Sequence, residues 1–475
     1  MASFSADSSA VRRSLKSRQP TAADERRQQL LERQKEARRD YTQQARAILQ
    51  AKQTEADHND GMQQQEQREE KKAEAAPIDE HDEEQEEEAE LSVTQPSNGQ
   101  LAGEFRRRRA EKRRLEYASQ FMTPQWLDSL PADLTDSWYA IPRPEGTRCF
   151  LIANHHSSMS RKRNGSVLHS SIATALPGGC HPSLLPAAAS TSPDDYCIVD
   201  CIYNDEQRCY YALDLLCWRG YLLFDATAEF RLYWMHDKLR TLAAPNPSHK
   251  SKRTFYPLVP LPVLPCLPSS LPSLYPQSPL LDCRQDGVLF VHKASEYVSG
   301  VLPTPLCLLW KDVQCSRWYV ATDGSGQQAD RQLLTAWLDS SGRLLTEDGV
   351  QLAEVAVGQL MGVEQPATGV RQLVRVSVSG LGDDGRLTDV RVEGEAGRGR
   401  LVADSWDKVL YQANARRGGT VSIQQIAEAM QHGVEEQQSR GLQHSQQVDA
   451  GDEMKTMPSQ DGHAIEQQSI DADMT

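Results

Sequence analysis

The chain has 475 residues, of which 39% are hydrophobic, and its mean hydropathy is −0.60, so composition alone indicates substantial unfolded length. This length fits two or three domains, or one domain with long disordered arms. The sequence holds no run of about 18 apolar residues and no apolar N-terminal segment, which excludes a transmembrane helix and a secretory signal. Ten cysteines without a CxxC pair predict reduced thiols in a cytosolic or nuclear protein, with no structural metal.

The formal net charge of −14 is the sum of basic and acidic blocks. Between Arg12 and Arg46, eleven Lys or Arg residues stand against five acidic ones, whereas Glu55–Glu90 holds sixteen acidic residues and three basic ones. A second basic cluster, RRRRAEKRR, follows at residues 106–114. We therefore expect a basic segment at 1–50 and a disordered acidic and basic linker at 51–114, because a stretch almost without aromatic residues cannot bury a core.

Within the basic segment, the run Asp24–Gln50 is predicted to be a helix, because neither Gly nor Pro interrupts it and Asp24 can cap it. An isolated helix of this kind is marginal in water. It is either an ordinary solvated or coiled-coil helix, or a helix that folds into the groove of an acidic partner. Its apolar stripe consists of Leu30, Ala37, Tyr41, Ala45 and Ile48.

The composition becomes globular near Leu115, and the core at 115–325 is predicted to be an α+β fold with mixed or antiparallel sheets. Helices are expected over Arg106–Gln120 and in the run before Leu242. A Pro-rich stretch at about 243–282 is expected to be a surface insertion. Short segments rich in β-branched and aromatic residues are expected to be strands, namely CFLIA, YCIVDCIYN, CYYALDLLCW, FRLYW and GVLFVHK.

Four strings at strand ends follow the order of the motifs of covalent nucleotidyltransferases, the DNA ligases and RNA guanylyltransferases. Arg143 stands where motif I has the lysine that takes up the nucleotide, and Ile202 stands where motif III has a carboxylate. A guanidinium stays protonated and cannot attack phosphorus. The resemblance implies a nucleotidyltransferase-like fold that holds a guanine nucleotide without catalytic residues; turns in an unrelated β domain are the alternative. The strings are RPEGTR (143–148), IVDCIYN (198–204), DGVLF (286–290) and LLWK (308–311).

Two further sets of strings resemble the snurportin family. ERRQQLLERQKEARRDYTQQAR, at residues 25–46, resembles its importin-β-binding segment. QFMTPQWL, SWYAIPRPEGTRCFLIA, YYALDLLCWRG, FRLYWMHDKL and TPLCLLWK resemble its cap-binding domain, in order, over about residues 118–320.

The snurportin resemblance implies a nuclear import adaptor that is not an enzyme and uses no cofactor or metal. Its expected partners are the 2,2,7-trimethylguanosine cap of small nuclear ribonucleoproteins and importin-β, with an exportin and Ran as further candidates and no membrane. The implied localisation is cytoplasmic and nuclear, with shuttling between the two.

The same resemblance assigns site residues. Trp310 takes the place of the tryptophan that stacks on the cationic base, although one extra residue separates it from TPL, and Trp126 lies where the family has a tryptophan beside the methylated amine. Arg148 and Arg163 are the candidate phosphate ligands. Trp138, Trp218 and Trp234 are expected in the core. The importin-β contacts are assigned to Arg26, Arg27, Leu30, Leu31, Arg38, Arg39 and Tyr41.

Residues 326–436 are predicted to form a β-rich extension, because LLTAWLD, QLVRVSVSG and TDVRVEGE are short and apolar, two of them with alternating residues. A small accessory meander without ligand is the favoured interpretation, and an OB remnant, by analogy with guanylyltransferases, is the alternative. ADSWDKVLYQANARR resembles the C-terminus of plant-type snurportin-like sequences, and residues 437–475 are expected to be a disordered tail.

Two functions of other classes stay open at this point. A working guanylyltransferase would form a covalent adduct with GTP. A general basic RNA-binding protein would contact phosphates through its arginine clusters without regard to the cap.

Overall fold

The computed structural model describes residues 21–36, 41–49, 109–110, 112–181, 184, 195–242, 254–320, 327–356, 360, 362–382, 386–397 and 400–453, the last thirteen by backbone alone. The predicted linker before residue 109, part of the Pro-rich insertion and the last 22 residues lie outside this set. No helix in the described part of the chain is long and apolar enough to cross a membrane.

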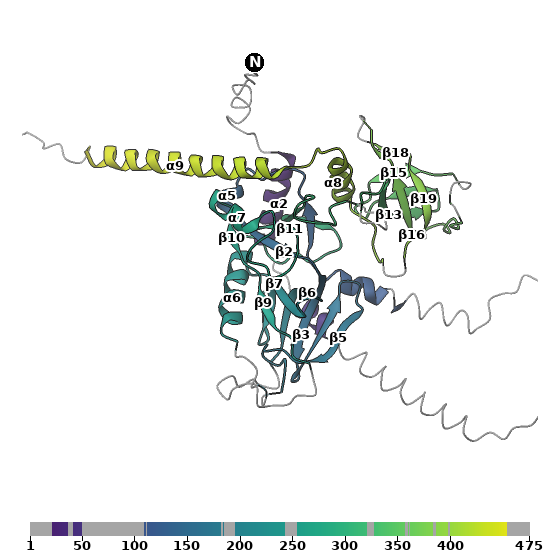
Figure 1. Cartoon of the computed structure of the whole chain (residues 1–475), viewed down its shortest axis with the longest axis horizontal. Helices are drawn as coiled ribbons and strands as arrows, with labels where there is room; N and C mark the ends of the chain where they lie inside the picture. The colour runs from purple at the N-terminus through teal and green to yellow at the C-terminus, as the bar shows by residue number, and fades with distance from the viewer. Residues whose placement is uncertain are drawn as a thin grey trace, which may run out of the picture.

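Two sheets form the core (Figure 1). The first has the order β5-β4-β3-β6-β7-β8 with β9 beside β7, and the second has the order β1-β12-β11-β2-β10. Their pairings are antiparallel except for β1 with β12 and β9 with β7. The first sheet holds β3 (Thr147–Asn154), β4 (Ser157–Lys162), β5 (Val167–Ile172), β6 (Cys197–Asn204), β7 (Cys209–Trp218), β8 (Tyr221–Leu222) and β9 (Leu258–Pro260). The second holds β1 (Thr123–Trp126), β2 (Trp138–Pro144), β10 (Leu264–Pro265), β11 (Gln285–His292) and β12 (Pro303–Trp310).

The central strands β6, β7 and β11 are buried along their whole length, which explains why their sequences are nearly continuous apolar runs. The predicted α+β class is confirmed. Trp138 and Trp218 are buried in the core as predicted, and Trp234 packs against it while partly exposed.

The prediction of a strand at FRLYW is wrong, because this segment lies in helix α6 (Ala228–Arg240). The side chain of Thr227 accepts a hydrogen bond from the backbone N–H of Phe230 and so caps the helix, and Glu229 stands in its first turn. These end signals outweigh the aromatic content of the segment. The other short helices of the core are α5 (Leu134–Ser137), η3 (Pro268–Ser270) and α7 (Leu271–Leu274), and residues 112–118 are also helical.

The N-terminal basic segment packs against the core instead of standing free. It contains α2 (Ala22–Glu36) and a second helical stretch over residues 42–49. The ring of Tyr41 stacks on Phe224 with centroids 5.4 Å apart, and its hydroxyl donates to Glu296 at 3.1 Å. Ala45 and Ile48 are 1% and 0% exposed within the main hydrophobic cluster. The part of the apolar stripe formed by Tyr41, Ala45 and Ile48 is thus covered by the chain's own core.

The C-terminal extension is part sheet and part helix. Its sheet has the order β15-β14-β13-β16-β19, with β17 and β18 as a separate hairpin. Helix α8 lies between this sheet and the core, and α9 begins on the core and runs away from it (Figure 1). Residues 437–453, predicted as disordered, belong to α9. The elements are β13 (Gln332–Asp339), β14 (Arg343–Leu345), β15 (Gln351–Glu354), β16 (Arg371–Val378), β17 (Gly380–Leu381), β18 (Leu387–Thr388), β19 (Arg391–Glu395), α8 (Trp406–Arg416) and α9 (Ile423–Glu453).

All ten cysteines are free and buried. Burial raises the pKa of these thiols, for example that of Cys217 to about 12, so the reactive thiolate is scarce. We expect little or no reaction with a thiol reagent in the native protein at pH 7 and ten reacting thiols per chain in guanidinium chloride. Glutathione in the same buffer serves as the reactive control, and fast labelling of several thiols in the folded protein would contradict the burial described here.

Candidate functional site

An ionic cluster lies where β2, β11 and β12 meet. The carboxylate of Asp286 accepts a hydrogen bond from Lys311 Nζ at 2.6 Å and another from Ser316 Oγ at 2.5 Å, and it is also ion-paired with Arg143. These are the residues of the strings that resemble motifs I, IV and V. The fold therefore brings Arg143 and Lys311 to Asp286, from which they are 143 and 25 residues apart in the sequence.

The electrostatics of this cluster follow from its burial. Burial alone would raise the pKa of Asp286, but Arg143 and Lys311 hold it below its ordinary value. Burial, and next the neighbouring Arg143, lower the pKa of Lys311 to about 8. The cluster therefore carries two cationic groups around one carboxylate, with an excess of positive charge at the end of the sheet.

The two candidate phosphate ligands lie on the neighbouring sheet. Arg148 in β3 donates two hydrogen bonds to Asp200, at 3.0 and 2.6 Å, and Tyr297 donates to the same carboxylate at 2.7 Å. Asp200 raises the pKa of Arg148 although burial acts in the opposite direction. Arg148 is thus already bound to a carboxylate.

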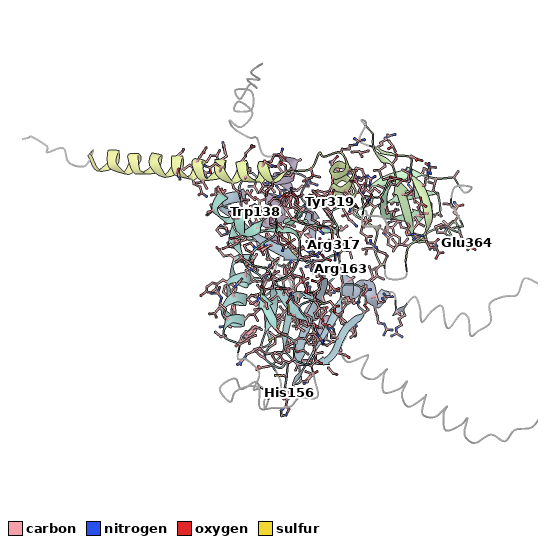
Figure 2. The ribbon with its side chains drawn as sticks, viewed as in Figure 1. Trp138, His156, Arg163, Arg317, Tyr319 and Glu364 are labelled. Carbon is pink, nitrogen blue, oxygen red and sulfur yellow. The ribbon has the colours of Figure 1, made fainter. Side chains whose placement is uncertain are left out.

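Arg163 donates to the hydroxyl of Thr123 at 2.6 Å. Burial, and next the charge of Arg148, lower the pKa of Arg163 to about 10, so it still carries its positive charge at neutral pH. Since its described hydrogen bond goes to a neutral hydroxyl, Arg163 suits an incoming phosphate better than Arg148 does. In the view of Figure 2, Arg163 and Arg317 both lie on the side of the core that faces the C-terminal sheet.

Trp126, at the end of β1, is half buried beneath α8. The ring of Tyr411 lies 4.9 Å from its ring, and the backbone N–H of Trp126 donates to Asp407 at 2.7 Å. Lys311 Nζ lies 5.7 Å from the centroid of the Trp126 ring. The structure thus places Trp126 beside the ionic cluster, with two side chains of the C-terminal extension over it.

Trp310 lies on the other face of the same sheet, which corrects its assignment to the site. Side chains of β12 alternate, so that Cys307 and Leu309 join the cluster that contains Leu289, whereas Trp310 joins Val288 in a second cluster. Trp310 is 0% exposed, and its indole N–H donates to the carbonyl oxygen of Val421 at 2.7 Å. It has no ring face open to a ligand. The extra residue after TPL explains this, because a shift of one position turns a strand residue to the opposite face.

The space between the two core sheets is nearly closed. Its cavity has a volume of about 20 Å³, close to what one water molecule requires, and it is lined in part by Pro124, Arg148 and Asp214. Ile202 is fully buried. Within the described residues there is no group of three His, Cys, Asp or Glu side chains that could hold a metal ion.

The mouth of the site carries two groups that the sequence did not single out. Trp318 is 50% exposed on the segment after β12, and its indole N–H donates to Glu145 at 3.3 Å. Arg317 is ion-paired with the same carboxylate. The only sequence signal was an Arg-Trp pair a few residues after the string LLWK, and such a pair is equally common on plain surfaces.

The predicted importin-β contacts are divided between the core and the solvent. Arg27 is 4% exposed, with its guanidinium carbon 5.7 Å from the Trp138 ring centroid, and Tyr41 is also buried. Arg26 is exposed, and with Leu30 it lines a hollow of about 620 Å³ against residues 298–305; Leu31 is half buried. Arg38 and Arg39 lie outside the described residues.

Comparison with known families supports the core assignment. Residues 120–310 match the family model of "Snurportin1, m3G cap-binding domain". Over these residues the chain is similar to the snurportin cap-binding family. The match ends at Trp310, so that the C-terminal sheet, α8 and α9 lie beyond it.

Solved structures similar to this chain include DNA ligases. A mycobacterial DNA ligase D complexed with ATP and MES is 14% identical, with 60% of this chain and 99% of that chain covered and a TM-score of 0.27. The ligase domain of LigD from M. tuberculosis is 14% identical, with 58% and 95% covered and a TM-score of 0.27. A Lig E DNA ligase is 13% identical, with 57% and 100% covered and a TM-score of 0.23.

Proposed function

We propose that this chain is a non-enzymatic nuclear import adaptor that binds the 2,2,7-trimethylguanosine cap of small nuclear RNAs and links the ribonucleoprotein to importin-β. The observation that carries the proposal is the match of residues 120–310 to the snurportin cap-binding family. The excess positive charge around Asp286, together with Arg163, supports it, because a cap presents a triphosphate to its receptor. The proposed adaptor shuttles between cytoplasm and nucleus.

The proposal includes the absence of nucleotidyl transfer. Arg143 occupies the position of the nucleophilic lysine and is ion-paired with Asp286. The amine of Lys311 is bound to the same carboxylate, although its lowered pKa leaves it closer to a free amine than an exposed lysine would be. Incubation with labelled GTP and magnesium should therefore give no covalent adduct. An adduct that forms with the parent protein and disappears in the Lys311→Met variant would contradict the adaptor proposal and indicate an enzyme.

Arg163→Ala is expected to weaken binding of trimethylated and monomethylated caps by the same factor, on the order of tenfold or more, because a hydrogen bond to a charged group contributes about 1.5–3 kcal/mol and a phosphate contact carries no information on base methylation. Isothermal titration calorimetry with both dinucleotide caps measures this. Arg240→Ala, an exposed arginine on α6, is the matched control and should bind as the parent does. Unequal losses for the two caps would argue against a phosphate contact.

The importin-β arm gives a separate prediction. Exchanging the exposed residues Arg26 and Arg33 of α2 for alanine should reduce importin-β affinity and its salt dependence, since both charges face the solvent. Pull-down or interferometry at two salt concentrations measures this, and the double variant of Arg113 and Arg240 is the control. Deleting residues 1–50 is a poorer test, because it also removes Tyr41, Ala45 and Ile48 from the core. Unchanged importin-β binding in the α2 variant would contradict the adaptor proposal.

A further inference from the structure

Three side chains meet at the mouth of the site. Arg317 Nε donates to Glu145 Oε1 at 3.0 Å, and Trp318 Nε1 donates to the same oxygen at 3.3 Å. The guanidinium carbon of Arg317 lies 5.3 Å from the centroid of the Trp318 ring. A planar cation is thus held against an indole ring and hydrogen-bonded through its edge to a carboxylate.

The indole and the carboxylate are held by the backbone around them. Trp318 N–H donates to Ser316 Oγ at 3.1 Å, and Ser316 Oγ donates to Asp286 in the ionic cluster at 2.5 Å. The backbone of Glu145 donates to Arg284 at 2.7 Å and accepts from Asn204 at 3.0 Å. Next to it, a Cβ at Gly146 would lie 2.3 Å from the carbonyl oxygen of Tyr203, so only glycine permits this turn. Trp318 and Glu145 are thus anchored through their backbones, while the side chain of Arg317 remains 53% exposed and can move away.

Among the described residues, the space between the two core sheets is too small for a purine. The cavity between the core sheets holds about 20 Å³, and Trp310 faces the opposite side of its sheet. Trp318 is a half-exposed tryptophan anchored directly to the ionic cluster, because Ser316 joins it to Asp286. Trp318 thus offers a half-exposed ring next to the cluster, whereas the ring of Trp126 is covered by Tyr411 of α8.

The group that now lies on Trp318 resembles the proposed ligand chemically. An N7-methylated guanine is also a planar cation, and it also presents an N–H donor, at N1, on its edge. A cation over an indole face and a charge-assisted hydrogen bond to a carboxylate are the two contacts that such a base requires. We propose that Trp318 and Glu145 form the base-recognition pair of this chain and that Arg317 is an internal occupant that the methylated base displaces. This inference rests on the proposed cap-binding function.

The displacement leaves no charge unpaired. Glu145 exchanges the guanidinium for the N1–H edge of a cationic base, and Trp318 exchanges one cation for another. Arg317, once released, stands two residues from Ser316 and is free to contact the triphosphate. The N2-methyl groups are not read by this pair, so it recognises the N7-methyl cation and leaves discrimination of the further methyl groups to other residues.

The test uses the full-length protein and two probes, the trimethylated dinucleotide cap and the nucleoside 2,2,7-trimethylguanosine, which has no phosphates. Trp318→Ala should weaken binding of both by about tenfold or more, and Trp318→Phe should restore part of the loss. Glu145→Gln should weaken both probes several-fold. Arg317→Ala should strengthen nucleoside binding, because the internal competitor is gone. Tyr233→Ala, a 71% exposed aromatic on α6, is the control.

The outcomes distinguish a failure of the proposed function from a failure of the proposed recognition pair. If the parent protein binds neither probe, the proposed function fails. If the parent binds and Trp318→Ala binds equally well, the function stands and this recognition pair is wrong. Weaker nucleoside binding by Arg317→Ala would also overturn the inference, since a displaced competitor cannot contribute to affinity. Circular dichroism and thermal unfolding confirm that each variant is folded.

Discussion

Trp310→Ala is expected to lower the free energy of unfolding by about 3–5 kcal/mol, as large aromatic truncations in cores do. The ring is 0% exposed in the cluster of Trp138, Phe290 and Met430, and its N–H is bonded to Val421. Urea titration followed by far-UV circular dichroism measures the loss. Cap affinity, measured where the variant is still folded, should change little.

The control for this substitution is Trp318→Ala, whose half-exposed ring should cost less than about 1 kcal/mol of stability, because it forfeits little beyond an exposed cation–π contact. Trp310 is thus expected to affect stability, where family analogy assigned it to cap binding. A Trp310→Ala variant with full stability and lost cap binding would restore Trp310 as the stacking residue.

Arg231→Met is the second substitution with a large expected effect. Arg231 and Asp214 form a salt bridge at 2.9 Å with side chains 0% and 6% exposed. Removing the cation leaves a buried carboxylate without its partner, which costs about 3–5 kcal/mol. Combining it with Asp214→Leu should recover much of the stability, because a hydrophobic pair can replace a buried ion pair. Urea titrations of the single and double variants test this.

The pH dependence of this variant has a definite sign. Burial raises the pKa of Asp214 even with Arg231 present, so in Arg231→Met the folded-state pKa rises further. A carboxyl group whose pKa is raised in the folded state makes the protein less stable as the pH rises above the pKa of the same group in the unfolded state, because the unfolded state releases the proton first. The stability deficit should therefore be larger at pH 8 than at pH 5. An equal deficit at both pH values would show that Asp214 does not titrate in the fold.

The sequence predicted the core strands well, because β6 and β7 are apolar runs with the length and composition of buried strands. It could not place Trp310. One additional residue after TPL leaves β12 an apolar strand, but it turns the tryptophan to the opposite face of the sheet. It also missed the docking of Tyr41 and Ile48, because an apolar stripe in a helix does not reveal whether a partner or the chain's own core covers it. The contact between Trp318 and Glu145 could not be predicted either, because the two residues lie 173 positions apart in the sequence.

Helix α9 of the C-terminal extension also differs from the prediction for a physical reason. Charge and glutamine content predicted a disordered tail from residue 437, but residues 437–453 continue α9, and at the start of this helix Ile426 and Met430 are 1% and 0% exposed in the second cluster. Two apolar side chains four residues apart are enough to fix the start of a helix on a core. Most of the remaining residues of α9 are polar and are compatible with a helix.

The closure of α9 over Trp138 and Trp310 has a consequence for synthesis on the ribosome. Met430 emerges 120 residues after Trp310 (430 − 310), so at about 5–20 residues per second the nascent chain presents this apolar surface uncovered for roughly 6–24 s. Throughout that interval the second sheet lacks its lid, and its apolar side chains are open to aggregation. A newly made chain therefore has to be held by a chaperone, or to delay collapse, until its last helix has left the exit tunnel.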